Sequence, residues 1–298
     1  MLSALYVVFY LLIFFLAGFM LAKFKVIDPK HSKLLSSLIL YVFVPAIIIR
    51  SFVNYFTIAN LQNYLFTFLV GLATVVFNVV VGYFVSKPFA KTDYDKRVYR
   101  YAFAVPNGNL AWGFVDGLMG PGAILSHSLF TIPTTIYCYT GGYALLTKRK
   151  IAFKTLLNPI TIALVIGIAL GLLPVTVPEP IMLVINKAAD CHVPCCMVVI
   201  GIIISEFKIR ELLKSPRAWI FSLIRMVGFP LLLRLILPFI ADAETLRVAV
   251  IYFSMPCGMY TLLFSEIVNE DRRSSAELVL VSQILAIATI PLVTLGLF

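Results

Sequence analysis

The feature that most constrains this fold is a succession of about ten apolar runs, each close to the roughly 20 residues that cross a bilayer as a helix. We expect these helices at residues 3–23, 34–53, 61–87, 98–118, 122–147, 156–173, 178–205, 217–240, 246–268 and 274–297. Hydrophobic residues make up 61% of the 298 positions and charged residues only 13%, so lipid must cover most of the surface. The sequence therefore predicts an all-α polytopic membrane protein with ten transmembrane helices.

The positive charges lie mainly between alternate helices. If the N-terminus is outside, 19 of the 24 Lys and Arg residues fall in loops or helix ends on the inner side. The positive-inside rule produces this asymmetry, so we expect a multi-pass protein of the cell's inner (plasma) membrane with both termini outside. The rule also accounts for the net charge of +10, and we therefore expect no nucleic-acid partner. The other five cations are Arg50, Lys187, Arg225, Arg234 and Arg247.

The two halves of the chain resemble each other at a spacing of about 149 residues, half the chain length. The matching pairs are Gly18 with Gly167, Pro45 with Pro194, Pro106 with Pro256, and Gly108 with Gly258. Because each half holds five predicted helices, an odd number, the second half enters the membrane from the opposite side. We therefore predict two inverted five-helix repeats, residues 1–147 and 148–298, an arrangement typical of secondary transporters.

The fourth and ninth predicted helices should break near their midpoints. The fourth carries AVPNGNLAWG (104–113) and the ninth carries FSMPCGMYTL (253–262), each with proline followed two residues later by glycine. Proline removes a backbone donor and glycine permits an unwound backbone, so carbonyls and amides are freed within the membrane. Such breaks survive where protein or a water-filled cavity covers them, which favours a central site between the repeats.

The N-termini of the two half-helices after these breaks would favour an anionic group, such as a carboxylate, at the crossing. The candidate substrate-binding residues are Pro106, Asn107, Gly108, Asn109, Pro256, Cys257 and Gly258, joined by Pro45, Tyr137 and Asp190. The alternatives are that the prolines merely kink packed helices, and that Asn107 and Asn109 only link neighbouring helices.

Several stretches resemble the auxin efflux carrier family, which holds the plant PIN-type exporters and bacterial carriers of malonate and related acids. They are LLSSLILYVFVPAIII (34–49), VPNGNLAWG (105–113), LLNPITIALVIGIALGLL (156–173), MPCGMYTLLFSEI (255–267) and VSQILAIATIPLV (281–293). Together they span nearly the whole chain.

The resemblance implies the fold of the bile-acid sodium symporters. Helices one, two, six and seven would form a scaffold, and helices three to five and eight to ten a moving domain in which helices four and nine cross. It also implies elevator-like alternating access, an organic anion contacted by Asn107, and a homodimer formed through the scaffold. Only residues 148–155 join the halves, which indicates a bacterial-type member. Plant members carry an acidic residue in the third helix, where this chain has only Asn78, so coupling to H⁺ or Na⁺ is left open.

The seventh predicted helix holds a polar patch, NKAADCHVPCC (186–196). Lys187 and Asp190 stand three residues apart and are expected to pair, either near the outer surface or along the substrate path. The cysteines and His192 are interpreted as packing residues rather than a metal site, because the sequence offers no second ligand cluster.

We therefore expect a secondary transporter of a small organic anion, with no enzymatic activity, no cofactor and no bound metal. The sequence carries no phosphate-binding loop and no zinc-protease motif. Three alternatives stay open at this point: a sodium-coupled symporter of amphipathic acids, a membrane carboxylate receptor that does not transport, and an intramembrane enzyme.

Overall fold

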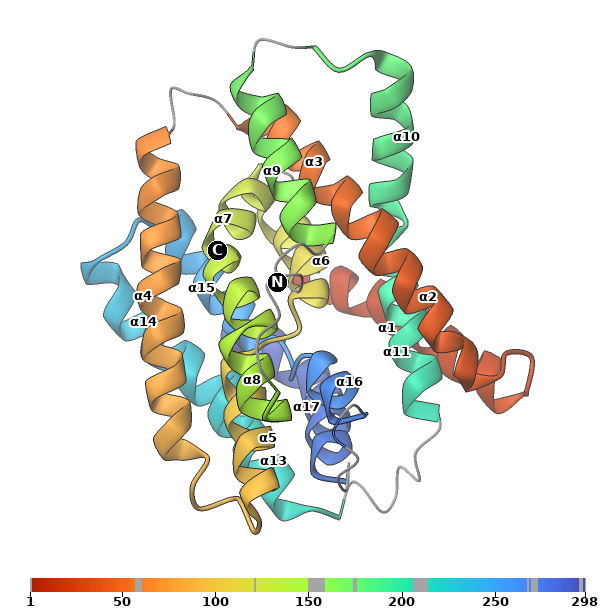
Figure 1. Ribbon diagram of the computed structural model, residues 1–298, viewed down its shortest axis with the longest axis vertical. Helices are drawn as coiled ribbons and strands as arrows, with labels where there is room; N and C mark the ends of the chain where they lie inside the picture. The colour runs from red at the N-terminus through yellow and green to blue at the C-terminus, as the bar shows by residue number, and fades with distance from the viewer. Residues whose placement is uncertain are drawn as a thin grey trace.

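The computed structural model describes residues 2–56, 61–120, 122–149, 159–173, 176–205, 214–266, 268, 273–294 and 297 (Figure 1). These residues are mostly helical and contain no strand, so the all-α prediction is confirmed. The first half contains α1 (Leu2–Lys23), η1 (Pro29–His31), α2 (Ser32–Leu38), η2 (Ile39–Phe43), α3 (Val44–Tyr55), α4 (Leu61–Val85), α5 (Asp93–Ala104), α6 (Gly108–Met119), α7 (Ala123–Tyr139) and α8 (Gly141–Thr147). The second contains α9 (Pro159–Leu172), α10 (Glu179–Asp190), α11 (His192–Ser205), α13 (Pro216–Leu223), η5 (Ile224–Gly228), α14 (Phe229–Ile236), η6 (Leu237–Phe239), α15 (Ala243–Ser254), α16 (Tyr260–Glu266) and α17 (Arg273–Thr294).

Each of the ten predicted ranges contains helix. Four helical stretches within the described residues are long and apolar enough to cross a membrane: Pro29–Asn54, Gln62–Val85, Glu179–Val199 and Pro216–Phe239. A fifth is formed if the bent pair Arg273–Ala286 and Ala288–Thr294 is taken as one span. Several other predicted spans are divided into shorter helices, such as α5 with α6 and α15 with α16. The protein is thus a multi-helix membrane protein, and the count of ten spans stays a prediction.

One group of helices consists of α1, α11, α3, α9 and α10. Within it α1 packs along α11, and α3 packs along α9 and α10. Gly18 lets α1 touch α11, because a Cβ there would collide with the backbone of Val198. Gly167 does the same for α9, where a Cβ would lie 3.0 Å from the Cβ of Phe52 on α3. The repeated glycines therefore serve equivalent close contacts in the two halves.

A second group is built from α4 to α8 and α13 to α17. Here α4 packs on α7 and α13 packs on α17, while α5 contacts α17 and α15 contacts α7. Two hydrogen bonds fasten the first turns of α5 and α15. The hydroxyl of Ser274 donates to Asp95 Oδ1 at 2.6 Å, and that of Ser126 donates to Glu244 Oε1 at 2.5 Å. Asp95 and Glu244 are 149 residues apart, so the two half-helices are anchored alike.

Two π-helical turns, η2 and η5, each precede a proline, Pro45 at the second residue of α3 and Pro230 at the second residue of α14. Proline cannot donate a hydrogen bond to the preceding turn, and the wider turn accommodates its ring. The second of these turns, η5, contains the buried residue Arg225.

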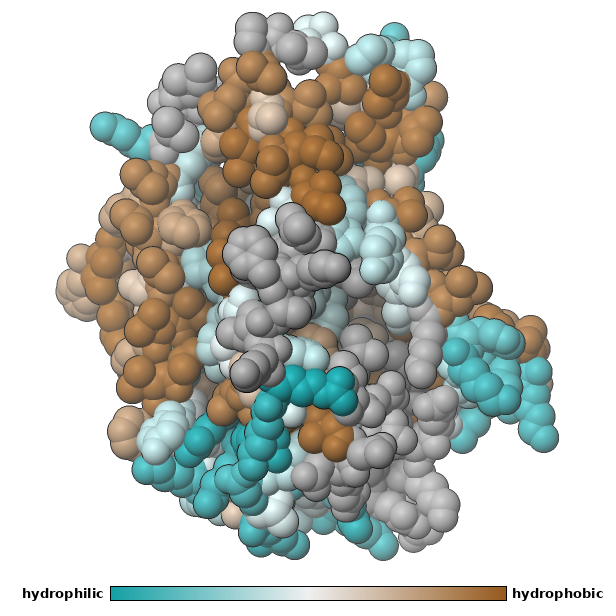
Figure 2. Space-filling view, viewed as in Figure 1, coloured by the Kyte–Doolittle hydropathy of each residue, from teal (hydrophilic) through white to brown (hydrophobic). Residues whose placement is uncertain are grey.

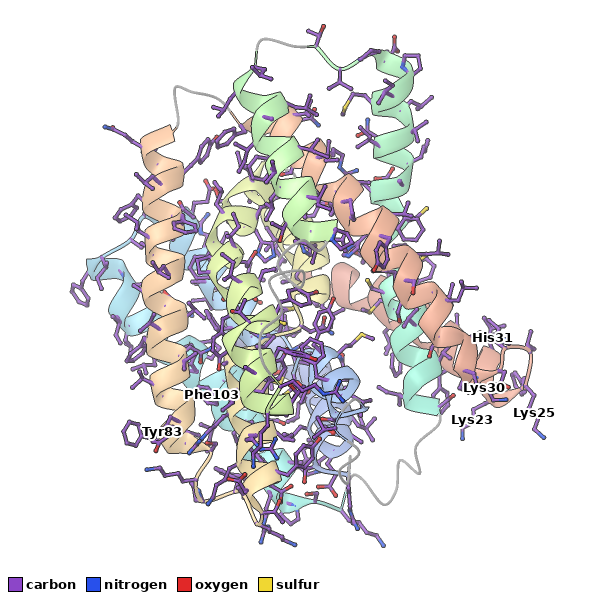
Figure 3. The ribbon with its side chains drawn as sticks, in the orientation of Figure 1. Lys23, Lys25, Lys30, His31, Tyr83 and Phe103 are labelled. Carbon is purple, nitrogen blue, oxygen red and sulfur yellow. The ribbon has the colours of Figure 1, made fainter. Side chains whose placement is uncertain are left out.

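The outer surface is largely apolar on the side drawn in Figure 2, and the hydrophilic side chains gather mainly toward the lower end of that view. Large exposed hydrophobic residues line α4, α9 and α10, among them Leu69, Val165 and Val184. Figure 3 shows Lys23, Lys25, Lys30 and His31 together at the tip that joins α1 to α2. Such a surface suits lipid around the helices and water at the cation-rich end.

Candidate functional site

The site is built around two interruptions in the second group of helices. The helix that begins as α5 ends at Ala104 and resumes as α6 at Gly108, and the helix that begins as α15 ends at Ser254 and resumes as α16 at Tyr260. Pro106 and Pro256 lie inside these gaps, as the sequence predicted. Both helices therefore break where proline and glycine release the backbone.

The two gaps meet and pair with each other through their backbones. The amide of Asn107 donates to the carbonyl of Pro256 at 2.8 Å, and the amide of Gly258 donates to the carbonyl of Val105 at 3.1 Å. Pro106 and Cys257 thus form an isolated antiparallel bridge. We call residues 105–108 and 255–258 together the crossing. It satisfies much of the backbone that the broken helices leave unpaired.

Gly258 is required at the crossing by close approach. A Cβ at this position would lie 3.0 Å from the carbonyl oxygens of both Pro106 and Val105. Gly108 is less confined, since its Cβ would meet only the Cε2 atom of Tyr252, at 3.7 Å. Although the two glycines match in sequence, only Gly258 is needed for a close approach of two backbone segments.

Ser282 of α17 holds the second gap in place. Its hydroxyl accepts the amide of Cys257 at 3.0 Å and donates to the carbonyl of Val279 at 3.1 Å. Sequence analysis did not include this serine in the candidate site. Ser282 lies 25 residues beyond Cys257 in the chain and on another helix, so this contact depends on how α17 packs.

Asn107 precedes α6 at the crossing and keeps an unpaired donor. Its side chain is 2% exposed, and its Nδ2 atom has no hydrogen-bond partner. It is the N-cap residue of α6, yet its side chain makes no capping bond to the helix. The positive end of the α6 dipole and a buried, unused amide therefore lie at the same point, an arrangement that suits an anionic ligand.

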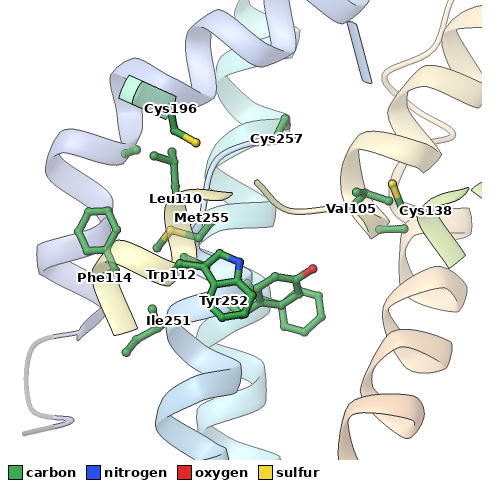
Figure 4. Close-up of a cluster of buried hydrophobic side chains, with 14 of the residues drawn as sticks. Val105, Leu110, Trp112, Phe114, Cys138, Cys196, Ile251, Tyr252, Met255 and Cys257 are labelled. Atoms are coloured by element: carbon green, nitrogen blue, oxygen red, sulfur yellow. The ribbon is translucent and has the colours of Figure 1, made fainter. Parts of the chain in front are cut away.

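Aromatic side chains pack beside the start of α6 (Figure 4). The ring of His127 on α7 lies edge-on to Trp112 of α6 at 4.9 Å and at 5.6 Å from Tyr252 of α15. His127 is fully buried, and neither of its ring nitrogens has a hydrogen-bond partner. This histidine is a second polar group near the crossing that the protein itself leaves unsatisfied.

The opposite ends of the breaks, where α5 and α15 terminate, are contacted by donors from α4 and η5. Arg225 donates from Nε to the carbonyl of Ala102 at 2.7 Å and from Nη1 to that of Met255 at 2.5 Å. On α4, Asn78 donates from Nδ2 to the carbonyl of Ala104 at 3.1 Å. The carbonyls at the negative ends of both half-helices are thus capped by side chains.

A crossing of two broken helices within an apolar helical protein is the geometry that the sequence resemblance implied. The family model described as membrane transport protein matches residues 4–294, almost the whole chain. The chain belongs to the auxin efflux carrier family. The protein is therefore a membrane transporter, and members of its family are transporters rather than enzymes. No curated protein matched the sequence.

Not every residue predicted for the site of this family member lies at the crossing. Asn109 is in the first turn of α6, but its side chain is outside the described part of the structure. Pro45 shapes the start of α3, which packs on α9, α10 and α7. Tyr137 is half-buried and packs over Gly141, where α7 passes into α8.

The predicted pairing of Lys187 with Asp190 is wrong. Asp190 Oδ1 instead accepts from Nη1 of Arg50 on α3, at 2.7 Å, and the described residues contain no ion pair between Asp190 and Lys187. The spacing along α10 suggested a local partner, whereas the packing of α10 on α3 supplies one 140 residues away. The side chain of Asp190 is 62% exposed, so this pair belongs to the surface between two helices.

Besides Ser282, the site predicted from the sequence of this transporter lacked Arg225 and His127. Arg225 did stand out as one of five cations away from the inner loops, and a charged residue within an apolar span is a functional candidate. That signal was available from the sequence. For His127 no comparable signal exists, because a single histidine in an apolar helix more often packs than binds.

Proposed function

We propose that this family member is a secondary transporter of a small organic anion, a carboxylate, with its binding site at the crossing. It would perform no chemistry on the substrate. The observation that carries the proposal is the unpaired, buried Nδ2 atom of Asn107 at the N-terminus of α6. A carboxylate placed there would accept from the amide and lie against the positive end of the helix dipole.

The chemistry of the surrounding side chains supports an organic rather than an inorganic anion. Trp112 and Tyr252 present ring surfaces beside the first turns of α6, and His127 offers ring nitrogens among them. Ligand sites of this kind combine an apolar lining with a few polar groups that fix orientation. A carboxylate head at Asn107 and a carbon body against the rings would match this composition.

Elevator-like alternating access is supported by the way the helices divide. The group containing α1, α3, α9, α10 and α11 would be the scaffold, and the group containing the crossing would move. The contacts between the groups include α6 with α1 and α11, and α7 with α3. The crossing is thus carried by one packed body whose boundary with the other passes along α6, the helix that begins at Asn107.

The proposal includes ten spans in two inverted repeats that cross the cell's inner (plasma) membrane, with both termini on its outer side. The equivalent roles of Gly18 and Gly167 and the equivalent anchors at Asp95 and Glu244 support the repeat. The cations at the tip between α1 and α2 support the orientation.

Transport by purified protein in liposomes tests the proposal. Liposomes preloaded with one carboxylate would be mixed with the same compound in radiolabelled form, over a panel of dicarboxylates and aromatic monocarboxylates. We expect saturable exchange for part of the panel and none in protein-free liposomes. Saturable binding without exchange would identify a receptor instead, and exchange that requires sodium would identify a sodium-coupled symporter.

A further inference from the structure

Arg225 is a cation buried in the middle of the moving group. Arg225 is 1% exposed, and among the described residues its side chain is the largest that is fully buried. It lies in η5, inside the apolar stretch Pro216–Phe239 that is long enough to cross a membrane. Burial of an unpaired charge is strongly unfavourable, so a compensating interaction has to be present.

The compensation comes from carbonyl groups and not from an acid. Nε and Nη1 of Arg225 donate to Ala102 and Met255, at the ends of α5 and α15. In the described part of the chain Arg225 forms no ion pair, and its third nitrogen, Nη2, has no hydrogen-bond partner. The negative ends of two helix dipoles therefore converge on a single guanidinium.

In transporters with broken helices, the C-terminal ends of half-helices and the unwound carbonyls are the groups that coordinate coupling cations. Here those groups already have donors. Arg225 donates to the carbonyls of Ala102 and Met255, and Asn78 donates to that of Ala104. A sodium ion at this place would have to displace a tethered positive charge that cannot diffuse away.

We propose that Arg225 is a built-in cation that takes the position of a coupling ion, so that anion binding and transport need no sodium. The proposal rests on the proposed function, because it concerns the coupling of that same transport. Arg225 would act as a positioning residue. Its charge holds the ends of α5 and α15 together, and this fixes the crossing and the N-terminus of α6 on its other side.

The first arm of the test uses the unmodified protein. Carboxylate exchange would be measured in proteoliposomes with sodium on both sides and again with all sodium replaced by N-methyl-D-glucamine. We expect rates equal within about twofold. Exchange that occurs only with sodium would overturn the inference about Arg225 while leaving the carboxylate transporter intact. Absence of any exchange or binding would instead overturn the proposed function.

The second arm removes and then restores the charge. Arg225→Ala should reduce exchange by at least about tenfold, and millimolar guanidinium in the same vesicles should restore part of it, with no gain for wild type. A merely structural defect would not respond to the added cation. Arg225→Ala that is fully active without any added cation would overturn the proposal.

Arg225→Lys covers the case in which Arg225→Ala does not yield folded protein, as judged by gel filtration. Lysine keeps the charge but has a single donor group, so we expect weaker exchange that remains independent of sodium. If Arg225→Lys is folded and its exchange requires sodium, the tethered charge is not the replacement for a coupling ion.

Discussion

The backbone amide of Asn107 donates to the carbonyl of Pro256 at 2.8 Å, which joins two breaks 149 residues apart in the chain. Both breaks are buried among apolar helices, where backbone groups need partners within the protein. The unpaired backbone groups of one gap therefore bond to those of the other. The pairing fixes where α6 begins, and it thereby fixes the position of the Asn107 side chain, whose Nδ2 atom has no partner.

Gly258→Ala should damage the crossing, whereas Gly108→Ala should not. The new Cβ at 258 would stand 3.0 Å from the carbonyl oxygens of Pro106 and Val105, and the latter accepts a hydrogen bond of the pairing. At 108 it would meet only a tyrosine ring at 3.7 Å. We expect Gly258→Ala to lower the free energy of unfolding by about 1–3 kcal/mol. Thermal unfolding of both purified variants measures this, and equal stabilities would contradict the close approach.

Ser282→Ala should destabilise the protein because it leaves the buried amide of Cys257 without its acceptor. The expected cost is about 1–3 kcal/mol. Ser222→Ala is the matched control, since Ser222 is also fully buried but its hydroxyl has no hydrogen-bond partner. Its removal should be neutral or stabilising. A control variant as unstable as Ser282→Ala would argue against the specific role of the Cys257 amide.

His127→Phe should fold as well as the wild type or better. Phenylalanine keeps the edge-on contacts with Trp112 and Tyr252 and removes two buried nitrogens that have no partner. We expect a free energy of unfolding equal to that of wild type or up to about 1 kcal/mol higher, together with weaker carboxylate binding. His127→Ala, which opens a cavity, should cost about 2–4 kcal/mol. Unweakened binding by His127→Phe would remove His127 from the site.

Arg50 and Asp190 should be coupled, and Lys187 and Asp190 should not. A double-mutant cycle on Arg50→Gln and Asp190→Asn should give about 0.2–1 kcal/mol, a small value because Asp190 is 62% exposed. The same cycle with Lys187→Gln should give about zero. Comparable coupling in the two cycles would show that Asp190 also pairs along its own helix.

The sequence allowed the breaks to be predicted because proline and glycine act on the backbone locally. Pro106 and Pro256 each disfavour a regular helix wherever the rest of the chain lies, and their offset of 150 residues, close to the repeat spacing, suggested breaks in corresponding helices of the two halves. The same kind of reasoning failed for Asp190, because a side chain has several partners within reach and only the packing of α10 on α3 selects Arg50. Arg225 lies between these cases. Its charge marked it as unusual, but its targets, Ala102 and Met255, are defined only once η5 lies beside the crossing.

Equilibrium binding of a radiolabelled carboxylate to the purified protein tests the central claim, that the substrate binds at the crossing, most directly. The comparison is between wild type, Asn107→Ala and Asn54→Ala, the last being an exposed asparagine of α3. Loss of one hydrogen bond to a charged group should raise the Kd of Asn107→Ala by about tenfold or more, while Asn54→Ala should bind like wild type. An unchanged Kd for a folded Asn107→Ala would contradict the account.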